Sequence, residues 1–247
     1  MAKTRLGIIG TGAFGAFMTR HLVPHFDLVL HDARKNAAAR TAKKWRAQTG
    51  SLHDAAACKI ILIAVPVQQM EKILRKLAPL MKPGTLVCDV GSVKMKPAKL
   101  MRKILPKNVD AVGTHPLFGP QSGKNGIKGL NIVVCNVRGK RANCVRDFCR
   151  DRLGLNVFQT TPQGHDQELA WVQGLTHLLA KVVTLLDLPV FHFTTKTYDH
   201  LEQMVEMVRY DSDELFRAIE RENPFTRNAK KKFFAAARKL EQKLLRG

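Results

Sequence analysis

A glycine-rich segment follows the first apolar run of the chain without a break. Residues 6–9 are apolar, residues 10–15 read Gly-Thr-Gly-Ala-Phe-Gly, and helical spacing begins within them. In this strand–turn–helix context the first glycine makes a tight turn, the second lets a pyrophosphate approach the backbone, and the third lets the helix pack closely on the strand. The N–H groups at the start of the helix then bind the phosphates. The segment predicts a dinucleotide-binding unit, with cofactor contacts at Gly10, Gly12, Ala13, Phe14 and Gly15.

An acidic residue stands at the end of the second predicted strand. Asp32 follows Gly10 by 22 residues, where a carboxylate binds the 2′-hydroxyl of an adenosine ribose. This spacing favours NAD. Arg34 and Lys35 come next and would instead bind the 2′-phosphate of NADP, but the Asp32 carboxylate repels that phosphate. We therefore predict NAD, keep NADP as the alternative, and expect further cofactor contacts from Arg34, Val65, Pro66 and Ser92.

Apolar runs alternate with helical stretches through the first part of the chain. The runs are nearly continuous, which is typical of parallel strands buried on both faces of a sheet. The predicted strands are residues 6–9, 28–30, 60–65, 86–90, 109–112 and 132–135, and the predicted helices are residues 14–22, 36–48, 68–80, 97–105 and 144–153. This alternation predicts an α/β fold with a Rossmann-like, doubly wound, mostly parallel sheet.

The strand signals stop after Thr160, and the rest of the chain has helical spacing. The predicted helices are residues 164–188, 196–209, 211–222 and 228–245, with prolines at 162, 189 and 224 between or before them. We predict a dinucleotide-binding domain over residues 1–159 and an all-helical substrate and dimerisation domain over residues 160–247. The apolar side chains between Trp171 and Leu186 exceed what so short a segment easily buries alone, which favours a homodimer through these helices.

The charge of the chain is strongly positive and uneven. Lys and Arg number 41 against 20 Asp and Glu, a net charge of +21. Residues 1–159 carry 28 basic against 8 acidic residues, residues 160–216 carry 3 against 9, and residues 217–247 carry 10 against 3. Such charge makes nucleic acid a candidate partner. Aromatic residues are only 6% and no nucleic-acid-reading motif is present, so a basic solvated surface without nucleic acid is favoured.

Cysteine usage and hydropathy point to a cytoplasmic protein. The five cysteines are odd in number and show no Cys-x-x-Cys spacing, which favours reduced thiols over a disulfide framework or a metal site. No apolar run is long enough to cross a bilayer, so no membrane association is expected. The first predicted strand begins by Leu6, which leaves no room for a signal peptide before it.

Two polar segments follow strands in the second half of the predicted sheet. Residues 88–94 read Cys-Asp-Val-Gly-Ser-Val-Lys, and residues 113–123 read Gly-Thr-His-Pro-Leu-Phe-Gly-Pro-Gln-Ser-Gly. Both should lie at the carboxyl edge of the sheet, beside the nicotinamide end of a dinucleotide. His115, between a strand end and a proline turn, is placed as a general base, although a lone histidine is more often a hydrogen-bonded structural residue. Ser92 fits a substrate contact and also the N-cap of the next helix.

With these segments, the sequence resembles the prephenate/arogenate dehydrogenase family of tyrosine biosynthesis. The glycine-rich loop, Asp-x-Gly-Ser-x-Lys at 89–94 and Thr-His-Pro-x-Phe-Gly-Pro at 114–120 occur in the family's order and spacing. The resemblance continues through Thr-Pro-x-x-His-Asp at 161–166, Gly-Leu-Thr-His at 174–177 and Glu-Asn-Pro at 222–224, and so covers nearly the whole chain. Residues 115–126 look especially like the plant-type branch.

This resemblance implies an NAD(P)-dependent oxidative decarboxylation of a small molecule, prephenate or arogenate. His115 matches the catalytic histidine, which accepts the proton of the ring C4 hydroxyl while C4 gives hydride to the nicotinamide and the ring carboxylate leaves as CO₂. Ser92 matches a serine that hydrogen-bonds near the same hydroxyl and the nicotinamide. His177 matches a histidine that helps to hold the substrate, and Gln121 and Ser122 are the remaining expected substrate contacts.

The chain departs from the family pattern at one pair of positions. Many members have an arginine that binds a substrate carboxylate where this chain has Met207, and some have an acid where it has Gln121. Arg209 lies about 200° away around a helix and cannot simply replace that arginine. The candidates for a replacement are Lys94, Lys124, Arg209 and His177.

Two other functions compete with this interpretation. A β-hydroxyacid or imine-reducing dehydrogenase shares the glycine-rich domain followed by helices, and Lys181 is placed where such enzymes carry a lysine. It would not need His115 in its proline turn. A basic nucleic-acid-binding protein on an inactive nucleotide fold would instead bind phosphates in a strongly salt-dependent way.

Overall fold

The structure is a computed structural model that describes residues 3–209 and 211–246. It consists of two compact units, Met1–His165 and Asp166–Gly247. The predicted domain boundary at residue 159 lies one residue before the end of the last strand, β8 (Asn156–Thr160). The division between the two units falls instead inside a helix, α7 (Pro162–Leu169). Because this boundary lies inside a continuous helix, no linker separates the two units, and the sequence shows no linker-like composition there.

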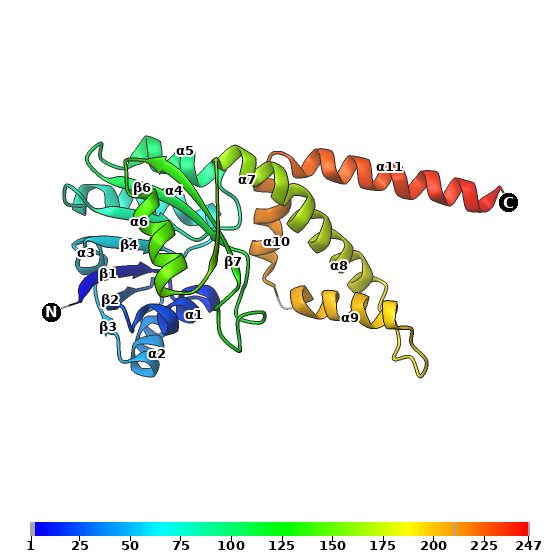
Figure 1. The fold of residues 1–247 in the computed structure, drawn as a ribbon, viewed down its shortest axis with the longest axis horizontal. Coiled ribbons are helices and arrows are strands. Elements are labelled where there is room, and N and C mark those ends of the chain that lie inside the picture. Colours follow the sequence, from blue (N-terminus) through cyan, green and yellow to red (C-terminus); the bar gives the residue numbers. More distant parts are fainter. Residues whose placement is uncertain (1–2, 210, 247) are drawn as a thin grey trace. The chain divides into compact units, whose positions relative to one another are not determined.

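Within the described part of the first unit, eight strands form one sheet in the order β3-β2-β1-β4-β5-β6-β7-β8 (Figure 1). The strands are β1 (Thr4–Ile9), β2 (Phe26–His31), β3 (Gln48–Thr49), β4 (Ile60–Ile63), β5 (Leu86–Asp89), β6 (Asp110–Pro116), β7 (Asn131–Arg138) and β8 (Asn156–Thr160). Neighbouring strands run parallel except β6 and β7, which are antiparallel. The order reverses beside β1, so the predicted doubly wound, mostly parallel sheet is confirmed.

Helices cover both faces of this sheet. They are α1 (Ala13–Leu22), α2 (Lys35–Trp45), α3 (Leu52–Ala56), α4 (Val67–Leu77), the 3₁₀ turn η1 (Ala78–Leu80), α5 (Met95–Ile104), α6 (Ala142–Asp147) and the π-helical turn η2 (Phe148–Arg152). One core cluster packs Ile8 of β1 against α1, α2 and η2, and a second packs Ile9 against α3, α4 and α5. Successive side chains of β1 thus point into opposite cores, which is why the strand sequences are continuously apolar.

Several boundaries differ from the predicted ones. The second helix ends at Trp45 rather than at residue 48, because Arg46 adopts a left-handed conformation with φ 55° and the chain turns into β3. The short elements β3, α3 and β8 were not predicted, because β3 has two residues and β8 is largely exposed. β6 continues to Pro116 instead of ending at residue 112, so His115 lies within a strand and not in a turn after it.

The second unit is helical, as predicted. The rest of α7 continues through the π-helical turn η3 (Ala170–Leu175) into α8 (Thr176–Leu185), and α9 (Lys196–Arg209), α10 (Asp213–Arg217), η4 (Ala218–Glu222) and α11 (Thr226–Leu245) follow. Among residues 3–209 and 211–246, no helix is long and apolar enough to cross a membrane. All five cysteines are free thiols, and only Cys144 is exposed.

Candidate active site

The glycine-rich loop joins β1 to α1 with glycines that serve different purposes. Gly10 has φ +96°, and a Cβ there would lie 2.5 Å from the Ala64 carbonyl oxygen. A Cβ on Gly15 would lie 2.0 Å from the Gly10 carbonyl oxygen, so the chain itself requires both glycines. Gly12 differs, because a Cβ there would meet no atom within 4 Å. The space beside Gly12 fits a ligand that approaches the backbone, as the dinucleotide prediction expects.

The start of α1 offers its N–H groups to an anion. Gly12 is the N-cap and supplies no side-chain cap, and no acidic residue stands in the first turn, which includes Ala13 and Phe14. Val65, which follows β4, also reaches this loop, since a Cβ on Gly10 would lie 3.0 Å from Val65 Cγ1. Pro66 is the N-cap residue of α4 beside it. Together these residues leave a partly uncovered positive end of a helix dipole at the carboxyl edge of the sheet.

The Asp32 carboxylate holds the glycine-rich loop to the end of β2. Its Oδ2 accepts hydrogen bonds from Thr11 N at 2.7 Å and Thr11 Oγ1 at 3.0 Å, and its Oδ1 accepts one from Arg34 N at 2.8 Å. Burial by itself would raise the pKa of Asp32, but these hydrogen bonds from Arg34 and Thr11 outweigh it and lower that pKa. The carboxylate is therefore ionised at neutral pH and lies beside the loop.

An open groove of about 330 Å³ runs beside this loop between α1 and α2. Arg34 and Arg40 both line it, together with Thr11 and Gly12. Arg40 was not predicted as a site residue. Its position one helical turn after Ala37, on the face of α2 that meets the groove, becomes visible only when α1 and α2 are packed together.

Lys94 is not available to a substrate, so its place among the candidate anchors was wrong. Only 1% of the residue is exposed, and its ammonium donates to the Asp89 carboxylate and, at 2.7 Å, to the Thr114 carbonyl oxygen. Thr114 Oγ1 donates in turn to the Asp89 carbonyl oxygen at 2.6 Å. Burial raises the pKa of Asp89, and the Lys94 charge and the Gly91 N–H oppose that rise. These contacts join the ends of β5 and β6.

His115 lies on β6 in direct contact with a second histidine. The residue is 3% exposed, and its Nδ1 lies 2.8 Å from Nε2 of His165, which is 1% exposed and stands in the first turns of α7. One of these two nitrogens must carry the proton of this hydrogen bond. When Nδ1 of His115 donates to His165, the basic lone pair of His115 is placed on Nε2. In that arrangement the contact holds His115 in the tautomer that can act as a base, and no role was predicted for His165.

The remaining predicted residues of the first unit lie on loops after strands. Ser92 is half-buried between β5 and α5. Gln121 and Ser122 are exposed in the loop after β6, where Ser122 Oγ accepts a hydrogen bond from Gly119 N at 3.0 Å. Lys124 is exposed in the same loop. Ser92 and His115 are therefore brought to the carboxyl ends of the adjacent strands β5 and β6, as predicted.

In the second unit, His177 and the nearby cations already have partners. His177 Nδ1 lies 2.9 Å from the Gln173 carbonyl oxygen, and its Nε2 lies 3.1 Å from Asp211 Oδ2. Arg209 Nη1 lies 3.3 Å from Glu206 Oε2 on α9. Lys181 Nζ lies 3.9 Å from Asp213 Oδ1. His177 is therefore oriented by a carboxylate, while the Arg209 charge is shared with its own helix.

Comparison with known families places these residues in context. The family described as "Prephenate dehydrogenase, nucleotide-binding domain" matches residues 18–133. The chain is 30% identical over 254 residues to Arogenate dehydrogenase 1, chloroplastic, of Arabidopsis thaliana, which covers 98% of this chain and 39% of that protein. It is 31% identical to Arogenate dehydrogenase 2, chloroplastic, of the same plant, over 89% of this chain and 64% of that protein. The chain thus spans less than two thirds of the length of these two relatives.

Solved structures share the fold. The prephenate dehydrogenase from A. aeolicus in complex with hydroxyphenyl propionate and NAD⁺ superimposes with a TM-score of 0.79 at 18% identity, over 100% of this chain and 92% of that one. Synechocystis arogenate dehydrogenase gives a TM-score of 0.71 at 18% identity, over 98% of this chain and 90% of that one. The matched residues include both the sheet and the helical region.

Proposed function

The chain belongs to the prephenate/arogenate dehydrogenase family, and from that premise we propose that it catalyses the NAD-dependent oxidative decarboxylation of prephenate to 4-hydroxyphenylpyruvate. The observation that carries this proposal is the buried His115–His165 pair at the carboxyl end of β6, one strand from Ser92. A general base must be oriented and must keep one nitrogen basic, and donation from His115 Nδ1 to His165 would meet both conditions.

In the proposed reaction the residues of this chain handle one proton. Bound NAD⁺ supplies the hydride acceptor for the hydrogen on ring carbon C4. His115 Nε2 accepts the C4 hydroxyl proton as that hydrogen leaves, and Ser92 hydrogen-bonds the same oxygen. Loss of the ring carboxylate as CO₂ then makes the ring aromatic, and the oxygen on C4 takes a proton back to become the phenol. The products are the hydroxyphenyl acid, CO₂ and the reduced cofactor.

Steady-state kinetics with both substrates and both cofactors tests this function. We expect NADH fluorescence to rise when prephenate and NAD⁺ are mixed with the protein. Arogenate is the second candidate substrate, favoured because both Arabidopsis relatives are named arogenate dehydrogenases. Turnover of neither compound with either cofactor would contradict the proposal.

Gln121 is expected to influence the choice between these substrates. Arogenate carries an ammonium where prephenate has a keto group, and a nearby carboxylate would favour that ammonium. Because this chain has Gln121 and not an acid, we expect prephenate to be used at least as well as arogenate. Gln121→Glu should raise the ratio of kcat/KM for arogenate to that for prephenate, with Gln163→Glu, on the exposed surface of α7, as a control. An unchanged ratio would show that Gln121 does not contact the side chain.

The glycine-rich loop fits a dinucleotide on three observations already described. The space beside Gly12 accepts a pyrophosphate, the start of α1 offers its N–H groups, and the ionised Asp32 lies beside the loop. Asp32 supports NAD, because its carboxylate accepts from a ribose 2′-hydroxyl and repels a 2′-phosphate. Arg34 and Arg40 support NADP as the second candidate, because both line the adjoining groove.

Asp32→Ala is therefore expected to weaken NAD⁺ more than NADP⁺. The substitution removes the hydroxyl acceptor and the repulsion together, so the ratio of the two dissociation constants should shift toward NADP⁺ by about tenfold or more, the size of one charge-assisted hydrogen bond. Fluorescence titration with the reduced cofactors measures both constants. If the unchanged protein already prefers NADP⁺, the arginines determine the choice and the assignment of Asp32 fails.

We also propose that the protein is a homodimer through its helical unit. Large apolar side chains remain exposed on the second unit, among them Leu185, Val190, Phe193 and Leu244. Exposed large apolar side chains favour association, because burying them against a partner removes their surface from water. Sedimentation velocity at low micromolar concentration should therefore find a dimer. A monomer at that concentration would contradict the proposal.

A further inference from the structure

A second groove in the first unit is lined by positively charged side chains and by no acidic side chain. It has a volume of about 420 Å³ and lies between α1, α2 and the loop after β6. Four cations line it, namely Arg20, Arg40, Lys44 and Lys124, and no aspartate or glutamate does. They come from three separate segments of the chain, so the concentration of charge is produced by the fold.

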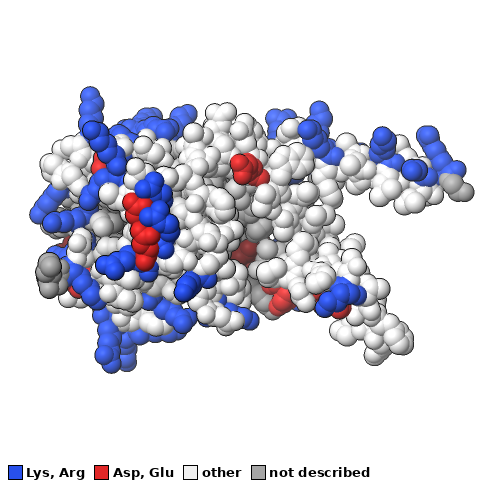
Figure 2. All heavy atoms as spheres, in the orientation of Figure 1, with Lys and Arg blue, Asp and Glu red and all other residues white. Residues whose placement is uncertain are grey.

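These cations have no carboxylate partners in the part of the chain that the structure describes. Neither α1 nor α2 contains an aspartate or a glutamate, and none of the four cations forms an ion pair there. Figure 2 shows the same imbalance where α2 lies in Figure 1, with Lys and Arg projecting at the lower left and little acidic surface beside them.

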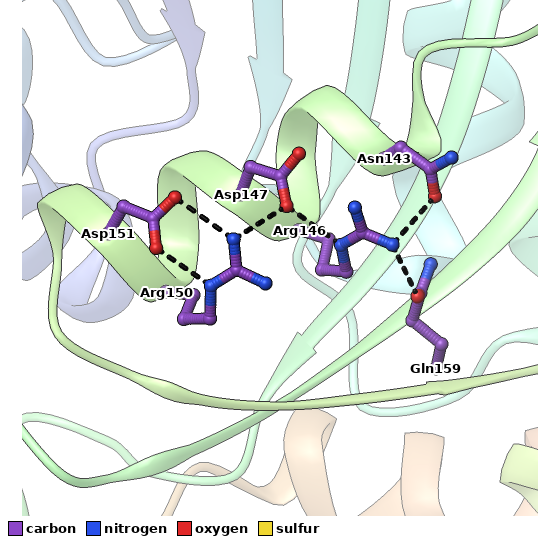
Figure 3. Close-up of polar contacts among 6 residues, drawn as sticks. All are labelled: Asn143, Arg146, Asp147, Arg150, Asp151 and Gln159. Carbon is purple, nitrogen blue, oxygen red and sulfur yellow. Dashed lines mark hydrogen bonds and ion pairs between the residues drawn. The ribbon is translucent and has the colours of Figure 1, made fainter.

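Other arginines of the same unit are neutralised locally. On α6 and η2, Arg146 lies 2.8 Å from Asp147, and Arg150 lies 3.0 Å from Asp147 and 2.7 Å from Asp151 (Figure 3). Asp147 and Asp151 have lowered pKa values, since hydrogen bonds from Arg146 and Arg150 favour their charged forms. Arg146 and Arg150 thus differ from the four cations of the groove between α1 and α2, which have no acidic residue of their own segments beside them.

The groove also has an aromatic wall. Lys44 Nζ lies 5.2 Å and the Arg20 guanidinium carbon 5.9 Å from the centre of a Trp45 ring, and Phe17 lines the groove as well. Arg20 Nη1 donates to the Lys124 carbonyl oxygen at 3.5 Å, which connects α1 to the loop. Cation–π contacts hold these side chains near the ring although their charges repel one another. An anion between them would relieve that repulsion.

We propose that this groove binds a small phosphate-bearing anion of about nucleotide size. Its phosphates would contact Arg40, Lys44 and Lys124, and its organic part would pack on Phe17 and Trp45. The volume lies within the range of small-molecule sites. The groove shares Ala13, Ala16, Arg40 and Thr41 with the one beside the glycine-rich loop, and from there it extends along α1 to Arg20. The proposal does not depend on the dehydrogenase activity.

Isothermal titration calorimetry with inorganic tripolyphosphate tests this site. The titration is run on the full chain with and without saturating NAD⁺, at low ionic strength and without divalent cations. We expect one bound tripolyphosphate per chain under both conditions. Lys44→Gln combined with Lys124→Gln should weaken it at least tenfold. The matched control is Lys72→Gln with Lys76→Gln, which removes two exposed charges from α4 and should change the affinity less than twofold.

Four results would overturn the proposal. Equal weakening by both double variants would mean diffuse attraction to a basic protein. Loss of binding with NAD⁺ would place the anion in the dinucleotide site. Absence of binding at low millimolar tripolyphosphate would exclude the site. Tighter binding of a single-stranded oligonucleotide that depends on Lys44 and Lys124 would make the ligand a nucleic acid. Melting temperatures of all variants verify that they fold.

Discussion

In the proposed reaction, His115→Asn is expected to lower kcat by about 10²–10⁴-fold, the usual effect of removing a general base. Asparagine preserves a polar side chain on β6 but has no basic nitrogen, so the C4 hydroxyl proton loses its acceptor. Cofactor affinity and melting temperature should change little, because the glycine-rich loop follows β1 and Asp32 follows β2, whereas His115 lies on β6. Single-turnover measurements of NADH formation separate the chemical step from product release.

The matched control for this variant is His53→Asn, at an exposed position of α3 in the same unit. It should leave kcat within twofold. His165→Asn is expected to give an intermediate loss together with a changed dependence of kcat on pH, since it alters the partner that orients His115. If His115→Asn retains kcat within a few-fold, His115 is not the base.

Lys94→Met is expected to lower the free energy of unfolding by about 3–5 kcal/mol, because it leaves a buried carboxylate without its counter-ion. Asp89 is 1% exposed, and its other donors are too few to replace an ammonium. The Thr114 carbonyl oxygen also loses a donor. Urea unfolding followed by circular dichroism measures the change.

The double variant Asp89→Asn, Lys94→Met distinguishes a buried ion pair from simple loss of packing. It removes both charges, so it should recover a large part of the stability that Lys94→Met loses. Lys99→Met, at an exposed position of α5, is the control and should change stability by less than about 0.5 kcal/mol. A neutral effect of Lys94→Met would contradict the importance of this pair.

The central elements of the first unit could be predicted from the sequence because they bury whole strands and helix faces. Continuous apolar runs gave β1, β2, β4 and β5 to within a few residues, and α9 was predicted with its observed bounds. The elements that were missed bury little. β3 has two exposed residues, and β8 is an edge strand with the exposed Phe158. Without burial on a regular face there is no hydrophobic period to detect.

The motifs located the candidate site, but not the partners of its residues. Gly10 and Asp32 were identified by local spacing next to strands, and the expected roles of Ser92 and His115 came from the resemblance to the family. From the sequence, Lys94 was a candidate to bind a substrate carboxylate. In the structure it is buried, and it forms an ion pair with Asp89 on the preceding strand.

Short-range periodicity and turn chemistry in the sequence therefore specified the larger strands and helices and their order along the chain, the glycine-rich loop, and the helical character of the second unit. Only the tertiary structure decided which side chains meet. His115 and His165 are 50 residues apart and become hydrogen-bonded when α7 begins beside β6. Arg20, Arg40 and Lys124 come together in one groove only when α1, α2 and the loop after β6 are packed. Such contacts depend on the register of strands and the docking of helices, which no local pattern specifies.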